Sequence, residues 1–428
     1  MPHTFAAFFI KMSFANTYFK RFKTEKELIS EKPETDLFLS IVIPAFNENE
    51  LCKSLQSIKN CELPEKSVEV IVVINSSKNT EEKIKIKNRE TYKKALEFAQ
   101  KNSSLQLKFF ILNFENFPPK FAGVGLARKT GMDEALHRFN SLKKPQGLIA
   151  GFDADAEVEK NYLVEIEKYF TKFPKIKAAS IYFEHPIQGN DFPKTIYKNI
   201  INYELHLRYF VEALRFANFP FAFHTIGSSF AVRADIYARQ GGMNRKKAGE
   251  DFYFLQKIIP LGTYGEINST KVIPSPRLSD RVPFGTGAAI SKMIKENKND
   301  FGTYDFETFI LLKQFFSKID TFYNNFSYHE IDDKMKSFLK KNKFEEDLKK
   351  ILANSPNLKI FKKRFFDWFN AFRVIKFLNF VHEEYYTKKN VRSEAEKLLK
   401  YRHPEIKIPE TEKELLLLYR KIQHKSSL

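Results

Sequence analysis

Blocks of hydrophobic residues alternate with polar, amphipathic segments along the first half of the chain. The hydrophobic blocks have the length of strands buried on both faces, and they occupy residues 38–43, 68–74, 105–112, 148–152 and 178–183. The segments between them have helical spacing over residues 48–59, 80–101 and 123–139, and over a stretch with Leu163, Ile166, Phe170 and Phe173 on its buried face. Strands that alternate with helices predict an α/β domain with a Rossmann-like, mostly parallel sheet flanked by helices.

The predicted helix over residues 123–139 has small residues on one face, at Ala127, Gly131 and Ala135. A glycine inside a helix costs about 1 kcal/mol relative to alanine. Gly131 therefore predicts a close approach, either of this helix to the sheet or of a ligand to the helix backbone.

The pattern changes at about residue 306, where strand signals fade and lysine-rich amphipathic helices continue to the C-terminus. A stripe at helical spacing predicts a buried face there; it consists of Phe361, Phe365, Trp368, Phe372 and Ile375. We therefore expect three regions, which are a lead-in over residues 1–36, an α/β domain over residues 37–305 and a helical region over residues 306–428.

Two pairs in the helical region have the spacing of a capping box, in which a hydroxyl and a carboxylate cap a helix start. They are Ser393 with Glu396 and Thr411 with Glu414. Each pair predicts that a helix begins just after its hydroxyl residue.

The composition excludes a wholly disordered chain, because 43% of the 428 residues are hydrophobic and 45 are phenylalanine. The 71 basic residues exceed the 52 acidic ones and give a net charge of +19. This surplus favours nucleic acid, an anionic membrane surface or phosphorylated substrates as partners, and it equally fits a solvated lysine-rich surface. Cys52 and Cys61 fit neither a disulfide framework nor a zinc site and predict two ordinary thiols.

No apolar run reaches the ~18–20 residues of a membrane span. The apolar patch near the start is broken by Lys11 and lacks the basic flank of a secretory signal. We therefore expect a cytoplasmic protein, with peripheral contact to an anionic membrane surface as an open alternative. Either Met1 or Met12 can serve as the initiator.

The candidate chemistry begins with two carboxylates, Asp153 and Asp155, which follow the hydrophobic block at residues 148–152. The carboxyl ends of parallel strands are where an α/β sheet presents groups to a ligand. Two carboxylates in that place can hold a divalent cation against a diphosphate. Alone, however, an Asp-x-Asp pair is weak evidence, since acidic loop residues are usually just solvated.

Other segments also place polar or small residues at the ends of predicted elements. The first strand is followed by Pro44, Ala45, Asn47 and Glu48, and the second by Asn75. The helix over residues 123–139 carries Arg128 and has Gly123 and Gly125 at its start. Further along the chain come Gly227 and Ser228 in a small-residue strand, Glu250 and Asp251 at a helix start, and Arg277 and Arg281 in a Pro/Gly-rich loop. Over roughly residues 37–290, this series resembles the family 2 glycosyltransferases of GT-A type.

The resemblance implies a metal-dependent enzyme, of hexosyltransferase type, that moves a sugar from a nucleotide-diphosphate sugar to an acceptor hydroxyl with inversion. On the donor side it implies that Asp155 ligates Mg²⁺ or Mn²⁺, with Asp153 near the ribose or the metal. The turn at residues 44–48, Asn75 and Arg128 would then contact the nucleotide. Arg277 and Arg281 are suited to clamp phosphate oxygens in a loop that closes on the donor.

On the acceptor side the resemblance implies that Asp251 is the general base and that Glu250 positions the acceptor, with the two able to exchange roles. Gly227 and Ser228 would lie beside the acceptor. A carboxylate in the first turn of a helix is also favoured by the helix dipole alone, so this role depends on the resemblance.

Some features depart from the family pattern or favour other classes. Asn75 stands where the family usually has an acidic residue that recognises the base, which leaves UDP and GDP donors both open. A sugar-phosphate nucleotidyltransferase would need a glycine-rich loop after the first strand, where this chain has an acidic turn. A non-catalytic or nucleic-acid-binding protein is the alternative motivated by the charge, although no nucleic-acid-binding signature is present.

Overall fold

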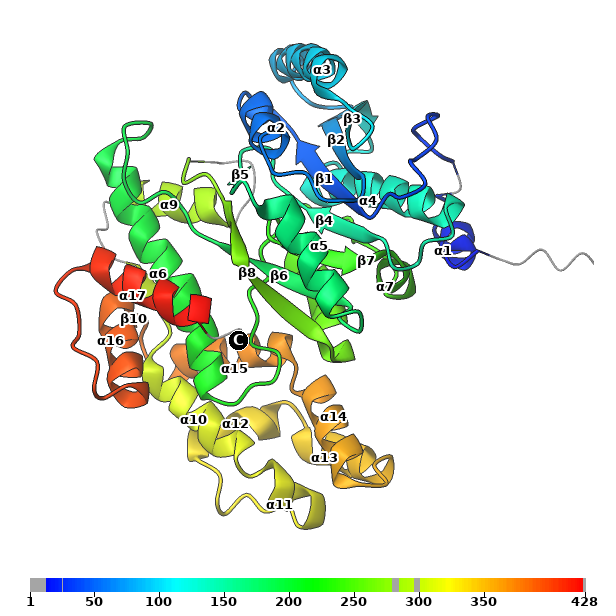
Figure 1. Cartoon of the computed structure of the whole chain (residues 1–428). Helices are drawn as coiled ribbons and strands as arrows, with labels where there is room; N and C mark the ends of the chain where they lie inside the picture. Colours follow the sequence, from blue (N-terminus) through cyan, green and yellow to red (C-terminus); the bar gives the residue numbers. More distant parts are fainter. Residues whose placement is uncertain (1–12, 25, 279–284, 296–300, 426–428) are drawn as a thin grey trace, which may run out of the picture. The chain divides into compact units, whose positions relative to one another are not determined.

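The computed structural model describes residues 13–24, 26–278, 285–295 and 301–425. The chain forms two compact units, each made from two separate stretches of sequence (Figure 1). The first unit contains Met1–Phe183 and Thr225–Pro274, and the second contains Glu184–His224 and Ser275–Leu428. This division differs from the expected boundary at residue 306, because two segments of the expected α/β domain group with the C-terminal helices.

An eight-stranded sheet forms the centre of the first unit, in the order β3-β2-β1-β4-β7-β6-β8-β5. The strands are β1 (Leu39–Ala45), β2 (Val68–Ser77), β3 (Leu107–Phe117), β4 (Leu148–Gly151), β5 (Glu157–Val158), β6 (Ala178–Phe183), β7 (Phe230–Arg233) and β8 (Tyr264–Ile273). Pairing is parallel from β3 to β4 and between β6 and β8. Only β5 and β7 run against their neighbours. The predicted α/β fold with a mostly parallel sheet is therefore confirmed.

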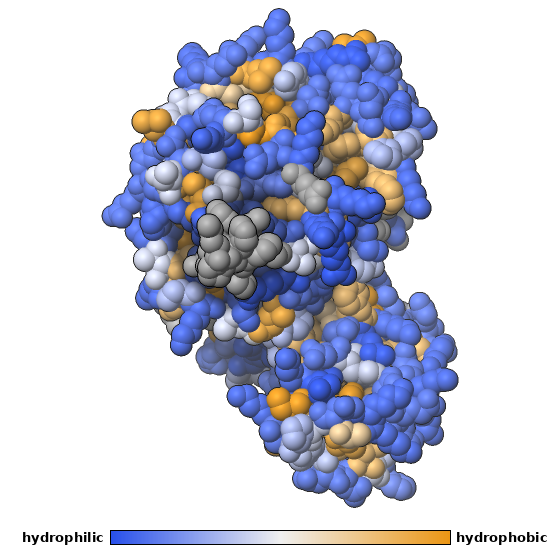
Figure 2. Space-filling view, turned by 90° about the vertical axis from the view of Figure 1, so that its right-hand side faces the viewer, coloured by the Kyte–Doolittle hydropathy of each residue, from blue (hydrophilic) through white to orange (hydrophobic). Residues whose placement is uncertain are grey.

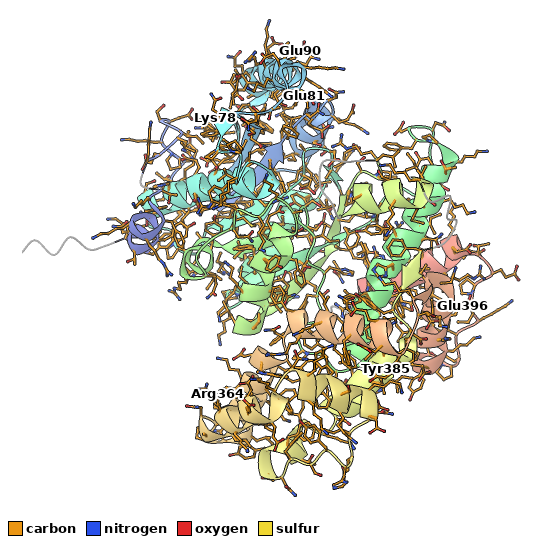
Figure 3. All side chains as sticks on the ribbon, turned by 180° about the vertical axis from the view of Figure 1, so that it is seen from behind. Lys78, Glu81, Glu90, Arg364, Tyr385 and Glu396 are labelled. Carbon is orange, nitrogen blue, oxygen red and sulfur yellow. The ribbon has the colours of Figure 1, made fainter. Side chains whose placement is uncertain are left out.

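Helices flank this sheet in the first unit (Figure 1). They are α1 (Asn16–Phe22), α2 (Leu51–Lys59), α3 (Glu82–Asn102), α4 (Val124–Ser141), α5 (Tyr162–Lys172), α7 (Ala234–Arg239) and α8 (Glu250–Ile258). The five strands and four helices expected from the hydrophobic pattern all form, with bounds shifted by a few residues. Phe173 is an exception, because it follows the end of α5 and is 41% exposed. Glu90 lies on the outer side of α3 (Figure 3).

Helix α4 packs closely on the sheet through Gly131. A Cβ atom at this position would lie 2.5 Å from a methyl carbon of Val42 and 3.1 Å from one of Val73. Of the two explanations for the small face of this helix, close packing on the sheet is therefore the one that the structure supports at Gly131.

The other side of α4 is bonded to residues 13–36. The Tyr18 hydroxyl donates to Asp133 at 2.6 Å, and Glu134 accepts two backbone N–H groups of this segment at 2.8 and 3.1 Å. Arg138 donates to a backbone carbonyl of the segment at 2.8 Å. All three of these α4 side chains are buried. The segment expected to be a polar lead-in thus covers the helix that carries Arg128.

The second unit is helical. It contains α6 (Lys194–Phe216), α9 (Thr286–Lys295), α10 (Phe306–Phe316), α11 (Ile319–Asn324), α12 (Asp333–Lys341), α13 (Phe344–Ala353), α14 (Leu358–Trp368), α15 (Ala371–Glu384), α16 (Val391–Arg402) and α17 (Glu412–Lys425), with a short pairing of β9 (Gly302–Thr303) and β10 (Lys389–Asn390). Phenylalanine rings fill much of its interior. Phe315, for example, contacts the rings of Phe344, Phe365 and Phe369.

Ion pairs link α6 to the C-terminal helices. The Glu204 carboxylate is fully buried and accepts hydrogen bonds from Arg208 on the same helix and from Arg420 on α17, both at 2.8 Å. A buried charge needs such partners, because desolvation is otherwise very costly. Glu212 pairs with Arg402 of α16 at 2.6 Å in the same way.

The predicted details of the helical region have mixed outcomes. The stripe from Phe361 to Ile375 is not one helix face, because α14 ends at Trp368, Asn370 caps the next helix, and Phe372 is 38% exposed. Thr411 and Glu414 do form the capping box at the start of α17, at 3.1 and 3.2 Å.

Ser393 does not cap a helix. Its expected role is taken by Asn390, whose side chain accepts from the backbone N–H groups of Arg392 and Ser393.

Hydrophilic residues cover most of the face shown in Figure 2. Within the described part of the chain, no helix combines the length and the apolar character needed to cross a membrane.

Candidate active site

The candidate site lies in the first unit, around the side chain of Arg128. This residue stands in the second turn of α4 and is only 2% exposed. Its guanidinium donates to the Asp153 carboxylate at 2.8 Å, to the Glu250 carboxylate at 3.2 Å and to the Gly227 carbonyl oxygen at 2.7 Å. Arg128 therefore joins residues from three of the predicted motifs.

Arg128, the residue that we expect to contact the nucleotide, bonds to two carboxylates and one carbonyl oxygen of the protein. A buried guanidinium with two carboxylates is held in a fixed orientation by charge-assisted hydrogen bonds. These carboxylates also hold the pKa of Arg128 above its ordinary value, although desolvation acts in the opposite direction. Arg128 can thus set the positions of Asp153 and Glu250 relative to each other.

Glycine at position 227 leaves room for two side chains. A Cβ atom there would lie 2.9 Å from a terminal nitrogen of Arg128 and 2.9 Å from a carboxylate oxygen of Asp251. Gly151, at the end of β4, is equally confined, since its Cβ would lie 2.5 Å from the Gly227 carbonyl oxygen. The backbone segment before β7 is therefore packed tightly between Arg128, Asp251 and the end of β4.

Asp251 has an environment that disfavours its charged form. It stands with Glu250 in the first turn of α8 and is only partly open to solvent. Burial, with the negative charge of Glu250 next, raises its pKa from the ordinary 3.8 to about 7, although Arg128 acts in the opposite direction. A carboxylate with a pKa near neutrality is suited to accept a proton.

Two hydroxyl groups close to this site are buried without a hydrogen-bond partner. The side-chain oxygens of Ser228 and Ser229 have none among the described residues, and both residues are at most 2% exposed. Ser228 was among the expected acceptor-side residues, whereas Ser229 was not. A buried hydroxyl without a hydrogen-bond partner is unusual. This observation adds Ser229 to the candidate residues.

The turn after β1 is held by amide side chains. The Asn75 side chain is buried and donates to the Ala45 carbonyl oxygen at 2.9 Å, so it fastens the ends of β1 and β2 together. Asn88 of α3 accepts from the backbone N–H of Asn47, which has a φ of 51°. Asn75 therefore has a structural partner in the position where the resemblance suggested contact with a base.

Pro44 and Ala45 end β1 and are buried in the sheet. Glu48 is 1% exposed, and its carboxylate accepts the backbone N–H of Glu50 at 3.0 Å just before α2. These bonds fix the turn that the resemblance assigns to the nucleotide.

The Gly-x-Gly segment before Arg128 has a structural explanation of its own. A Cβ atom on Gly125 would lie 2.1 Å from the backbone oxygen of Lys246, and one on Gly123 would lie 3.4 Å from the Cα of Lys247. The loop that precedes Glu250 and Asp251 therefore leaves no room for a side chain at Gly125.

The remaining candidate residues are placed as follows. Asp155 lies partly exposed two residues beyond Asp153, whose side chain is 38% exposed. The structure shows no group of three or more His, Cys, Asp or Glu side chains arranged for a metal within its described ranges. Arg277 belongs to the second unit, and its backbone N–H donates to the Ser275 hydroxyl at 3.3 Å. Arg281 lies outside the described residues.

Comparison with known families decides the class of this domain. Residues 40–239 match the family described as glycosyl transferase family 2. The chain contains a family 2 glycosyltransferase domain. The match begins in β1 and ends in α7, so it includes Arg128, Asp153 and Gly227 but stops before Asp251. No curated protein matches the chain significantly.

Solved structures with some similarity to the glycosyltransferase domain include S. aureus TarS, with a TM-score of 0.33 and 15% identity over 56% of this chain and 36% of that chain. TarS 1-349 in complex with UDP-GlcNAc has a TM-score of 0.39 and 13% identity, over 69% of this chain and 77% of that chain. The complex with UDP has a TM-score of 0.36 and 14% identity over the same shares. This chain thus spans about a third of the longer TarS chain.

Proposed function

We propose that the protein transfers a sugar from a nucleotide-diphosphate sugar to an acceptor hydroxyl, with inversion, and that Asp251 is the general base. The observation that carries this proposal is the set of contacts around Arg128. One buried guanidinium bonds to Asp153 on the donor side and to Glu250 on the acceptor side. Asp251, the neighbour of Glu250, has a pKa suited to proton transfer near neutral pH.

The proposed reaction is a single displacement. The Asp251 carboxylate takes the proton of the acceptor hydroxyl as its oxygen attacks the anomeric carbon of the donor. The bond between that carbon and the diphosphate oxygen breaks, and the nucleoside diphosphate leaves with the electron pair. Arg128 keeps Asp153 and Glu250 in place, and Glu250 in turn raises the proton affinity of Asp251.

Asp153 and Asp155 would hold a divalent cation, Mg²⁺ or Mn²⁺. Two carboxylates are oxygen ligands of the kind that these ions prefer, and such ions commonly keep waters and bind substrate phosphates for their other positions. When bound, the ion would neutralise charge on the leaving diphosphate. Asp153 can still offer its Oδ2 atom, because Arg128 donates to Oδ1 of this carboxylate.

The test uses the full chain with a panel of UDP-, GDP- and dTDP-sugars, with and without Mn²⁺, and measures the released nucleoside diphosphate. We expect release with at least one donor, and loss of release when the metal is chelated by EDTA and regained on adding Mn²⁺. Asp251→Asn should reduce turnover with an acceptor by roughly 10²–10⁴-fold while the donor still binds.

The matched control is Asp333→Asn, which removes a carboxylate from the first turn of α12. It should leave turnover unchanged. Equal turnover of Asp251→Asn and the parent protein would exclude Asp251 as the base, and full activity after chelation would exclude the metal.

A further inference from the structure

Four cations gather in two loops that touch each other beside the candidate site. Lys120 lies in the loop before α4, and Arg245, Lys246 and Lys247 lie in the loop before α8. The second loop packs against the start of α4, because a Cβ atom on Gly125 would lie 2.1 Å from the Lys246 backbone oxygen and one on Gly123 would be in van der Waals contact with Lys247. All four side chains are exposed.

Aromatic rings hold three of these cations in defined places. The guanidinium carbon of Arg245 lies 4.3 Å from the ring centre of Phe121, and the ammonium nitrogen of Lys120 lies 5.4 Å from the same centre. The Lys246 nitrogen lies 3.8 Å from the ring centre of Tyr253. Cation–π contacts favour such positions without neutralising the charge, so the cations are ordered but still available to an anion.

The cluster is also bonded to α8, the helix that carries Glu250 and Asp251. The Asn244 side chain donates to the backbone oxygen of Glu250 at 2.8 Å, and Tyr253 follows Asp251 by two residues on α8. The loop of three cations therefore leads directly into the acidic pair that we assign to the acceptor. Arg128 does not add to this cluster of available cations, because its guanidinium is paired with the carboxylates of Asp153 and Glu250.

No carboxylate within the described ranges forms an ion pair with any of these four cations. Like charges held together repel each other, and a bound polyanion relieves that repulsion. Arginine and lysine are the side chains that bind phosphate oxygens best, the former with two parallel hydrogen bonds. The arrangement is therefore complementary to a ligand with several phosphate groups.

We propose that Lys120, Arg245, Lys246 and Lys247 bind phosphate groups of the acceptor, so that the acceptor is a molecule bearing two or more phosphates as well as the hydroxyl that receives the sugar. This assignment rests on the proposed function, because it takes the Glu250–Asp251 side of the site as the acceptor side. A phosphate-bearing acceptor is favoured over nucleic acid, since the Phe121 and Tyr253 rings already carry cations and nucleic-acid binding uses free rings for base stacking.

The experiment measures binding of short-chain inorganic polyphosphate to the full chain by calorimetry at several salt concentrations. The test variant combines Arg245→Gln, Lys246→Gln and Lys247→Gln. The matched control combines Lys83→Gln, Lys93→Gln and Lys101→Gln, which removes three exposed cations from α3. A single-stranded oligonucleotide with the same number of phosphates provides the comparison with nucleic acid.

We expect the test variant to bind polyphosphate at least tenfold more weakly, with a shallower dependence of affinity on salt, and the control to change by less than about twofold. Equal losses of polyphosphate affinity in both variants would show that only the net charge matters, and they would overturn the proposal. Unchanged binding in the test variant, or tighter binding of the oligonucleotide than of polyphosphate, would also overturn it.

Binding and hydrolysis of the nucleotide sugar separate this inference from the proposed function. The test variant should retain the donor affinity and the donor hydrolysis rate of the parent protein, because the cluster does not contact Asp153. A weaker donor affinity would show that the cluster binds the donor diphosphate and would overturn the assignment to the acceptor. Absence of donor binding and turnover in the parent protein would instead refute the proposed function.

Discussion

Gly227→Ala adds one methyl group at the point where Arg128 and Asp251 meet. The new Cβ would lie 2.9 Å from an atom of each side chain, which is closer than van der Waals contact allows. Arg128 cannot move aside freely, because it is buried and bonded to Asp153, Glu250 and Gly227 itself. We therefore expect the substitution to displace the guanidinium and to weaken at least one of its bonds.

The expected size of the effect follows from that bond. A hydrogen bond to a charged group contributes about 1.5–3 kcal/mol, and each 1.36 kcal/mol lost from the transition state lowers the rate about tenfold. Turnover should therefore fall roughly 10- to 100-fold. Because Arg128 lowers the pKa of Asp251, its displacement should also move the acidic limb of the pH–rate profile to higher pH.

The assay is release of nucleoside diphosphate in the presence of an acceptor, measured between pH 5 and pH 9, with a thermal unfolding curve for each variant. Gly302→Ala is the control, since its Cβ would meet only Lys388 at an ordinary 3.5 Å. The control should keep the activity and the pH profile of the parent protein. A Gly227→Ala protein with unchanged turnover and an unchanged acidic limb would refute the inferred role of Arg128 in organising the site.

Three further outcomes are expected. Activity of the parent protein should fall as the pH drops through about 7, because Asp251 must be ionised to accept a proton; a rate that stays level down to pH 5 would contradict this. Since the pKa of Asp251 is higher in the folded protein than in the unfolded chain, its ionisation destabilises the fold as the pH rises from about 4 to about 7. Asp251→Asn should therefore raise the melting temperature at pH 8, with a gain that shrinks toward pH 4, and a lower melting temperature at pH 8 would argue against the raised pKa. Asn390→Ala should lower the free energy of unfolding by about 1 kcal/mol in urea titrations, because it removes the cap of α16. Ser393→Ala should lower it by less than half as much. A larger loss of stability for Ser393→Ala than for Asn390→Ala would contradict the observed cap.

Much of the fold follows from the hydrophobic pattern, because strands buried on both faces leave long apolar blocks. Strand β7 does not fit that rule. It has only four residues and lies between β4 and β6 in the opposite direction, so neither its length nor its pattern predicts its place in the centre of the sheet. The grouping of α6 with α16 and α17 was also not predictable from local patterns, since it brings together residues about 200 positions apart.

The candidate site was predictable as a set of residues but not as a set of contacts. The order of motifs along the chain placed Arg128, Asp153 and Asp251 among the candidate residues, and the structure brings them together in the first unit. The motif order did not show that Arg128 pairs with the carboxylates of Asp153 and Glu250. Nor did it show that the loop containing Lys246 packs against Gly125. Both outcomes depend on where distant loops meet, and no local pattern contains that information.

The family match begins at residue 40, but residues before it are also part of the folded domain, because they bond to helix α4. A shortened protein that began at residue 40, where the family match begins, would still contain Asp133, Glu134 and Arg138. Without Tyr18 and its neighbours, these charged side chains would lose bonds that they make in the intact protein. Anyone who isolates this domain for crystallisation or engineering should therefore keep the chain from Ser13 onward, because the helix that orients Arg128 is completed by residues that precede the family match.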